Sequence, residues 1–131
     1  MNMDIRTNAQ VIHELYDAYV TGIIAAFDAY TDDSVWVEVG RNERTGVYRG
    51  KQAILEHGMQ LAVLTDGTIA TKVEEILPGD DHVAVLERAT AKRNGRELDM
   101  DCCTMYTLRD GKIAELHVLP FDAARWDEFW S

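Results

Sequence analysis

The chain has 131 residues, 47% of them hydrophobic, and a formal net charge of −10 at pH 7. This length and apolar content predict one folded domain with a buried core, and the negative charge disfavours binding to nucleic acids or anionic membranes. No apolar run reaches the ~20 residues that span a bilayer, and the first ten residues lack the basic start and apolar core of a signal peptide. We therefore expect a cytoplasmic protein whose partner is a small molecule.

Three helices are expected in the first half of the chain. The capping-box sequence Thr7-x-x-Gln10 precedes hydrophobic residues at helical spacing, which predicts the first helix. Gly22 interrupts this pattern, and a short second helix is expected to end near Tyr30. Residues 46–50 are interpreted as a turn into a third amphipathic helix, which runs from Lys51 to about Leu64.

The second half of the chain is predicted to form strands. After an early strand at 35–39, four longer ones are expected at 68–77, 82–93, 96–108 and 112–119, followed by a short helix or turn at 122–130. Asn94-Gly95 and Asp110-Gly111 are strong hairpin signals, because both central residues of a type I′ turn need a positive φ. Helices followed by a meander of antiparallel strands indicate an α+β fold. A curved sheet that wraps around helices forms a cone, and its apolar interior is a natural ligand pocket.

This order of elements, with the segments GVYRGKQAI, ATAKRNGRELD, LRDGKIAEL and FDAARWDEFW, resembles the nuclear transport factor two-like superfamily. The resemblance is closest to its SnoaL-like and ketosteroid isomerase-like branch. It implies one cone-shaped domain over residues 1–131, with three N-terminal helices packed in a curved antiparallel sheet (a cystatin-like α+β barrel). It leaves the reaction open, because such cones host isomerases, polyketide cyclases, epoxide hydrolases, dehydratases and members without known activity.

Glu38 is the main candidate for proton transfer. It is a lone carboxylate in an apolar strand, where it shares a face with Trp36 while three valines face the other way. Two interpretations stay open: Glu38 lies inside the pocket, or it is exposed or paired with Arg41 or Arg44. The resemblance aligns Glu38 with the catalytic aspartate of ketosteroid isomerases and so implies a general base.

Three more residues are candidates for catalysis. The resemblance places Asp122 near the acid/base aspartate of SnoaL-like cyclases, although aspartate is also favoured as the N-cap of a final helix. His57 lies on the apolar stripe of the third helix, either as a satisfied core group or as a proton-transfer group with an ordinary pKa near ~6.5. Tyr16 is one residue from the position that aligns with the oxyanion-hole tyrosine, and Thr104 stands where the resemblance expects the oxyanion-hole aspartate.

Glu87 falls on a strand face that otherwise looks buried. A buried unpaired carboxylate is costly, so Glu87 is a pocket acid, a partner for a buried arginine, or a sign that the expected strand register is wrong by one residue. Cys102 has no base at an interpretable spacing, so a thiol nucleophile is not indicated. The full set expected to line the pocket is Tyr30, Trp36, Gly58, Leu61, Glu87, Met100, Cys102, Thr104, Tyr106, Leu116 and Val118.

These features predict a cofactor-independent acid/base enzyme, with no metal, that acts on a small and largely apolar organic molecule. The reaction would be an isomerisation, a cyclisation or a related lyase step, with natural-product metabolism as its setting. Two alternatives stay open: an epoxide hydrolase or polyether-type cyclase that uses paired carboxylates, and a non-catalytic dimeric module that binds a small ligand. The resemblance also implies a homodimer through the outer sheet face that carries Cys103, Met105 and Thr107.

Overall fold

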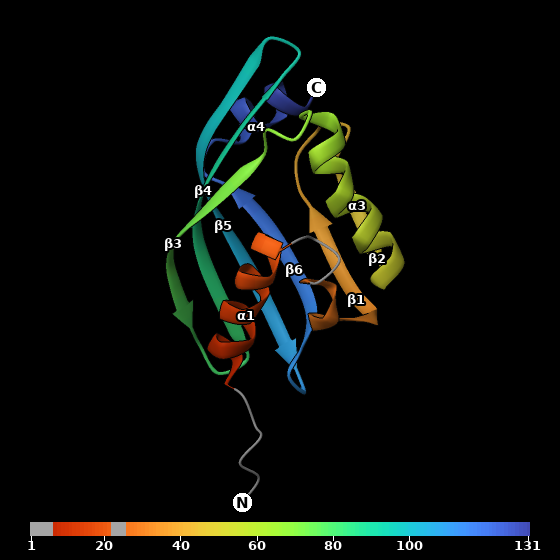
Figure 1. Ribbon diagram of the computed structural model, residues 1–131, viewed down its shortest axis with the longest axis vertical. Helices are drawn as coiled ribbons and strands as arrows, with labels where there is room; N and C mark the ends of the chain where they lie inside the picture. Colours follow the sequence, from red (N-terminus) through yellow and green to blue (C-terminus); the bar gives the residue numbers. More distant parts are fainter. Residues whose placement is uncertain (1–6, 22–25) are drawn as a thin grey trace, which may run out of the picture.

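The computed structural model describes residues 7–21 and 26–131 (Figure 1). Part of the expected second helix, residues 22–25, lies outside this described range. The helices are α1 (Asn8–Thr21), the short 3-10 helix η1 (Phe27–Ala29), α3 (Lys51–Leu64) and α4 (Ala123–Trp130). The strands are β1 (Tyr30–Glu38), β2 (Gly46–Arg49), β3 (Ala70–Pro78), β4 (His82–Arg93), β5 (Arg96–Arg109) and β6 (Lys112–Pro120).

The strands form one six-stranded sheet in the order β2-β1-β6-β5-β4-β3. The sheet curls around the helices: α1 contacts β3 and β4, and α3 contacts β1 and β2 (Figure 1). The short α4 contacts β5 and lies near the tip of the β4–β5 hairpin. This arrangement confirms the α+β fold with a curved sheet around helices.

Two details of the expected sheet are wrong. The segment interpreted as a turn, residues 46–50, contributes the short strand β2, which pairs antiparallel with β1. β1 pairs with β6 in parallel, so the sheet is not purely antiparallel. Parallel neighbours need a long connection, and here it runs through β2, α3 and the β3–β5 meander. Neither strand has a local sequence pattern that predicts this parallel pairing.

The two hairpin predictions are confirmed. Asn94 and Gly95 have φ angles of 49° and 75°, and Asp110 and Gly111 have φ angles of 53° and 76°. These tight turns fix the registers of β4 on β5 and of β5 on β6, so the inward-facing residues line up in rows across the concave face. One row contains Trp36, Leu116, Tyr106 and Val83, and the next contains Glu38, Val118, Thr104 and Val85.

Candidate active site

Glu38 lies on the concave face of the sheet, as the last residue of β1. It is only 3% exposed, which excludes the exposed alternative. Its Oε1 accepts a hydrogen bond from Trp36 Nε1 at 3.2 Å and lies 3.1 Å from His57 Nε2. The Arg44 Nη2 atom lies 3.7 Å from the same oxygen, so the carboxylate is both buried and paired with a cation.

Arg44 is the cation of this cluster, and the sequence indicated it only as one of two possible partners of Glu38. It comes from the loop between β1 and β2, yet it is only 1% exposed. Its Nη1 donates to the backbone oxygen of His57 at 3.3 Å, and its Nη2 lies 3.0 Å from His57 Nε2. Burial lowers the pKa of the Arg44 guanidinium, and the nearby Glu38 opposes that shift. A guanidinium stays protonated in proteins, so Arg44 brings a fixed positive charge to Glu38.

His57 of α3 is the third member, and aromatic rings surround it. Tyr48 stacks on the imidazole at a centroid distance of 3.6 Å, and Trp36 meets it edge-on at 4.8 Å. Burial lowers the pKa of His57, the hydrogen bond to Glu38 raises it, and the charge of Arg44 lowers it again. The net shift is downward, which favours a neutral imidazole at neutral pH.

The neutral imidazole has two ways to place its proton in this cluster. With the proton on Nε2, it donates to Glu38; with the proton on Nδ1, Nε2 accepts from Arg44, because one ring nitrogen cannot do both. Within residues 7–21 and 26–131, Glu38 Oε2, Arg44 Nε and His57 Nδ1 are buried without a hydrogen-bond partner. A cluster with a movable proton and unpaired polar atoms is suited to bind and protonate or deprotonate a ligand.

A second buried polar cluster surrounds Glu87 of β4. Glu87 is 8% exposed and accepts a hydrogen bond from the Tyr16 hydroxyl. The hydroxyl oxygens of Tyr16 and Tyr106 lie 2.8 Å apart. Burial raises the pKa of Glu87, while hydrogen bonds from Tyr16 and Thr104 partly oppose it. Burial also raises the pKa of Tyr16 and of Tyr106 well above the ordinary value, so both phenols stay protonated. Glu87 is therefore an inward-facing acid, and the predicted register was correct.

The two clusters share the concave face. β1 and β4 are three places apart in the strand order, or ~14 Å along the sheet at ~4.8 Å per strand. Cys102 pairs directly with Glu87 and lies between the two carboxylates. Burial, followed by the charges of Glu87 and Glu38, raises the pKa of its thiol to about 12. The thiol therefore stays protonated, which disfavours a role as a nucleophile.

The structure does not bring Asp122 to either cluster. Its side chain is exposed, and Oδ1 accepts a hydrogen bond from the backbone nitrogen of Arg125 at 3.1 Å. Asp122 is thus the N-cap of α4, the alternative that the sequence left open. The physical reason is that β6 ends at Pro120, so the chain has already left the concave face before Asp122.

The other residues expected to line the pocket are inside the fold. Eight of them are buried and two, Leu61 and Val118, are half-buried: Tyr30, Trp36, Gly58, Leu61, Met100, Cys102, Thr104, Tyr106, Leu116 and Val118. They do not form one group. Tyr30, Trp36, Tyr106 and Leu116 belong to the core beneath α1, whereas Met100 and Cys102 pack with the aromatic residues of α4.

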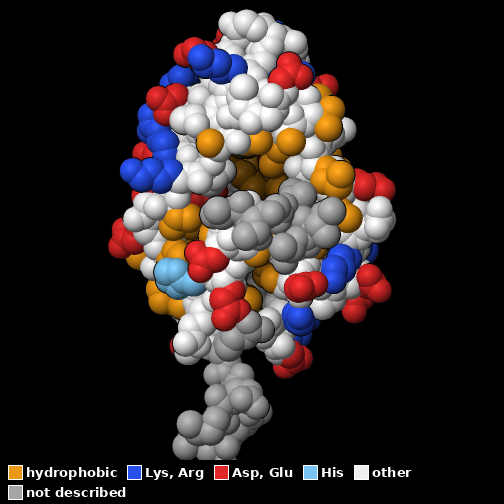
Figure 2. Space-filling view, viewed as in Figure 1, with side chains coloured by type: hydrophobic (Ala, Val, Ile, Leu, Met, Phe, Trp, Pro, Cys, Tyr) orange, Lys and Arg blue, Asp and Glu red, His pale blue; other side chains and the backbone are white. Residues whose placement is uncertain are grey.

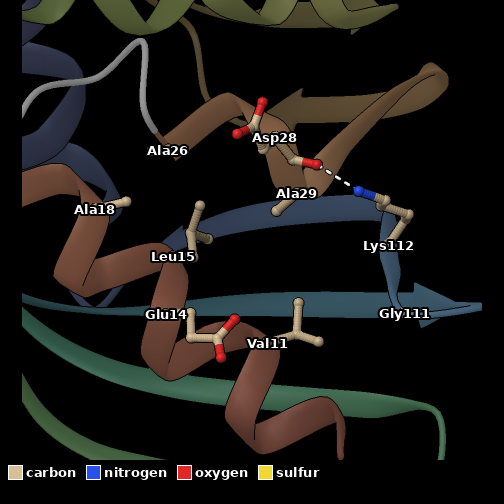
Figure 3. Close-up of a pocket in the computed structure, with 9 residues that line it drawn as sticks. All are labelled: Val11, Glu14, Leu15, Ala18, Ala26, Asp28, Ala29, Gly111 and Lys112. Atoms are coloured by element: carbon tan, nitrogen blue, oxygen red, sulfur yellow. Dashed lines mark hydrogen bonds between the residues drawn. The ribbon is translucent and has the colours of Figure 1, made fainter. Parts of the chain in front are cut away.

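Hollows reach the surface in more than one place among the described residues. Figure 2 shows hydrophobic side chains around a hollow near the centre of the face that carries α1 and α3. A cavity of about 320 Å³ lies between α1, η1 and the β5–β6 turn, and Figure 3 shows the residues that line it. Lys112 at its rim donates to the backbone oxygen of Asp28 at 2.6 Å. None of the residues that line this second cavity belongs to the Glu38 or Glu87 clusters.

Among the residues that the structure describes, neither a cluster of metal ligands nor a membrane-spanning helix is present. No three or more His, Cys, Asp or Glu side chains in this part of the chain are placed together to hold a metal ion. No helix within the same residues is both long and apolar enough to cross a membrane.

The chain belongs to the SnoaL-like domain family, whose model matches residues 12–116. It is 28% identical to Bal32a from a soil-derived mobile gene cassette, with a TM-score of 0.89 over 95% of this chain and 96% of that one. A Xanthomonas campestris protein of unknown function with a cystatin-like fold is 22% identical, with a TM-score of 0.88 over 96% of this chain and 99% of that one.

Two further similarities concern another solved structure and a sequence relative. A putative SnoaL-like polyketide cyclase from Jannaschia sp. CCS1 is 19% identical, with a TM-score of 0.69 over 95% of this chain and 92% of that one. The uncharacterized protein Rv0034 of Mycobacterium tuberculosis is 25% identical over 92% of this chain and 94% of its own length. The similarities below 25% identity support the fold alone.

Proposed function

We propose that this protein is a cofactor-independent acid/base enzyme that isomerises or cyclises a small, largely apolar organic molecule. The observation that carries the proposal is the buried Glu38–His57–Arg44 cluster, which has a second buried proton-bearing cluster on the same concave face. A ligand-binding module needs an apolar cavity, whereas proton transfer needs an acceptor and a donor positioned on one substrate. The concave face carries a candidate acceptor in the first cluster and a candidate donor in the second.

Glu38 is the proposed proton acceptor. Its Oε1 is engaged by Trp36, His57 and Arg44, whereas its Oε2 has no partner among the described residues. That unpaired oxygen can take a proton from a C–H group beside a carbonyl. The fixed charge of Arg44 stabilises the ionised carboxylate before transfer, and neutral His57 can hold or return the proton.

The Glu87 cluster is the proposed hydrogen-bond donor to the substrate oxygen. Because burial raises the pKa of Glu87, its protonated form is more favoured than for an ordinary carboxyl group. A protonated Glu87 donates to the Tyr16 oxygen, and the Tyr16 hydroxyl is then free to donate to an oxygen on which negative charge develops. One such donor in a water-excluded site typically contributes ~10²–10³-fold in rate.

Epoxide opening is a second candidate, because the concave face carries two buried carboxylates. Glu38 has Arg44 beside it, and Glu87 lies three strand positions away. In this alternative one carboxylate activates water and the other, protonated, donates to the epoxide oxygen. The two candidates use the same residues and differ only in the substrate that they turn over.

The test is a turnover assay on a panel of enones, polyketide-like ketones and epoxides with purified protein. Glu38→Gln keeps the shape of the side chain but removes the proton acceptor, so kcat should fall by ~10²–10⁴-fold with little change in KM. Asp122→Asn is the matched control, since it makes the same acid-to-amide change outside both clusters and keeps a good helix cap. Turnover that survives Glu38→Gln contradicts the assignment of Glu38. Ligand binding without any turnover favours the binding module.

We also propose a homodimer through the convex face of the sheet. Cys103, Met105 and Thr107 are half-buried on that face, opposite the inward rows. In the same registers lie Leu119, which is 38% exposed, and Val47, which is 64% exposed. Exposed apolar side chains in a contiguous group are typical of an interaction surface.

A cytoplasmic location and a role in natural-product metabolism stay predictions.

A further inference from the structure

We propose that Asp127 of α4 is a positioning residue for the Glu38–His57–Arg44 cluster, because it fixes the loop that carries Arg44 into the site. The proposal rests on the proposed function of Glu38 and His57. Asp127 touches none of the three side chains, and it acts only through residues 40–45, here called the arginine loop.

The arginine loop is hydrogen-bonded to the Asp127 carboxylate. Asp127 Oδ1 accepts one hydrogen bond from the backbone nitrogen of Arg41 at 2.9 Å and another from Asn42 Nδ2 at 2.7 Å. These two hydrogen bonds lower the pKa of Asp127, so it is ionised at neutral pH. Gly40 has a φ of +109°, and a Cβ at this position would lie 2.4 Å from Asp127 Oδ1. Only glycine lets the loop come so close to the carboxylate.

Asn42 carries the connection from Asp127 to Arg44. While its Nδ2 donates to Asp127, its Oδ1 accepts from the backbone nitrogen of Arg44 at 2.8 Å. The amide therefore links a carboxylate on α4 directly to the backbone of the arginine that contacts His57. Asn42 also closes the loop on itself, because its backbone nitrogen donates to Thr45 Oγ1 at 3.1 Å.

The rest of α4 holds the same loop. The ring of Trp130 lies 5.2 Å from Arg44 Cζ and 5.7 Å from Arg93 Cζ, both within the range of cation–π attraction. Arg93 also donates to the backbone oxygen of Phe129 at 3.3 Å and pairs with Glu43 of the loop. The C-terminal helix thus fastens both ends of the arginine loop, which explains how a loop residue can be fully buried.

Release of the loop should change the protonation of His57. The groups that face the imidazole are Glu38 from β1, Arg44 from the loop, and the rings of Trp36 and Tyr48. Burial lowers the pKa of His57 most, the hydrogen bond with Glu38 raises it, and the charge of Arg44 lowers it. If Arg44 moves away and water enters, the two lowering effects weaken while the effect of Glu38 stays. The pKa of His57 should then rise.

The experiment is an NMR titration of the histidine ring nitrogens in the full chain, with His57 assigned by its loss in His57→Asn. Asp127→Ala should raise the pKa of His57 by about one unit, the usual size of such environmental shifts. Asp127→Asn keeps an acceptor oxygen for both loop donors and should titrate like the wild type. Glu128→Ala is the matched control, because it removes an exposed charge from the next position of the same helix.

An unchanged His57 titration in a folded Asp127→Ala variant overturns the proposal, even if that variant is less stable. If Asp127→Ala does not fold, Asn42→Ala breaks the same connection from the loop side and should give the same upward shift. The titration needs no substrate, so its result is independent of whether Glu38→Gln abolishes turnover. Once a substrate is known, Asp127→Ala should lower kcat and move the pH–rate profile, and Glu128→Ala should do neither.

Discussion

Replacing Arg44 by Met tests whether a buried charge pair holds the candidate site together. The side chains of Arg44 and Glu38 are 1% and 2% exposed, and the charged atoms lie 3.7 Å apart. Removing one partner of a buried pair leaves an uncompensated charge and costs about 3–5 kcal/mol. Met keeps most of the aliphatic stem of arginine, so the loss reports the charge rather than the packing. For a domain of this size we expect the unfolding midpoint to fall by roughly 10–20 °C.

The assay is urea and thermal denaturation, followed by the fluorescence of the three tryptophans, of which Trp36 contacts Glu38 and Trp130 lies against Arg44. Adding Glu38→Gln to Arg44→Met removes the remaining charge, so the double variant should be more stable than Arg44→Met alone. Arg88→Met is the matched control: Arg88 and Asp99 are 2.6 Å apart, but their side chains are 42% and 63% exposed, so little change is expected. A double variant that is less stable than Arg44→Met would show that the unpaired charge of Glu38 is not the cause of the loss.

Three further outcomes are expected. Because the pKa of His57 is lowered in the folded state, the unfolded chain binds the proton more readily, and stability should fall as the pH drops below ~6.5. His57→Asn should flatten this pH dependence in thermal unfolding between pH 7 and 5. An unchanged pH dependence would mean that another group causes it. Tyr16→Phe removes a hydrogen bond that lowers the pKa of Glu87, so carbon-13 NMR should show that pKa rising further rather than falling. Sedimentation at micromolar concentration should show a dimer that Met105→Lys converts to a monomer, and a monomeric wild type would contradict the proposed interface.

Much of the site follows from the periodicity of strands and helices. Alternation in β1 indicated that Glu38 and Trp36 share a face, and the helical stripe placed His57 on the inner side of α3. The same period of two put Glu87 on the inner face of β4, although a carboxylate there looked like an error of register. Its partners explain it: Tyr16 comes from a helix 71 residues earlier in the chain, and no local pattern could reveal that pairing.

The parts that the sequence could not predict depend on contacts between distant segments. Arg44 lies in a loop with no periodicity, and its burial follows from Trp130 and Asp127 at the other end of the chain. The role of Asp122 was ambiguous from the sequence, because an aspartate just after a strand can be either a catalytic residue or a helix cap. Only the point where β6 ends separates the two. The sequence likewise did not predict the parallel β1–β6 pair or the four-residue strand β2, because strand pairing depends on the whole fold.

A crystal structure of the Glu38→Gln variant with a substrate from the panel bound shows directly whether one substrate contacts both buried clusters of the concave face. We expect the reacting atom within ~3 Å of the amide at position 38, the reach of proton transfer, and the substrate oxygen on the Tyr16 hydroxyl. A substrate bound outside the cone, for instance in the cavity beside Lys112 (Figure 3), with neither cluster in contact, would contradict this expectation.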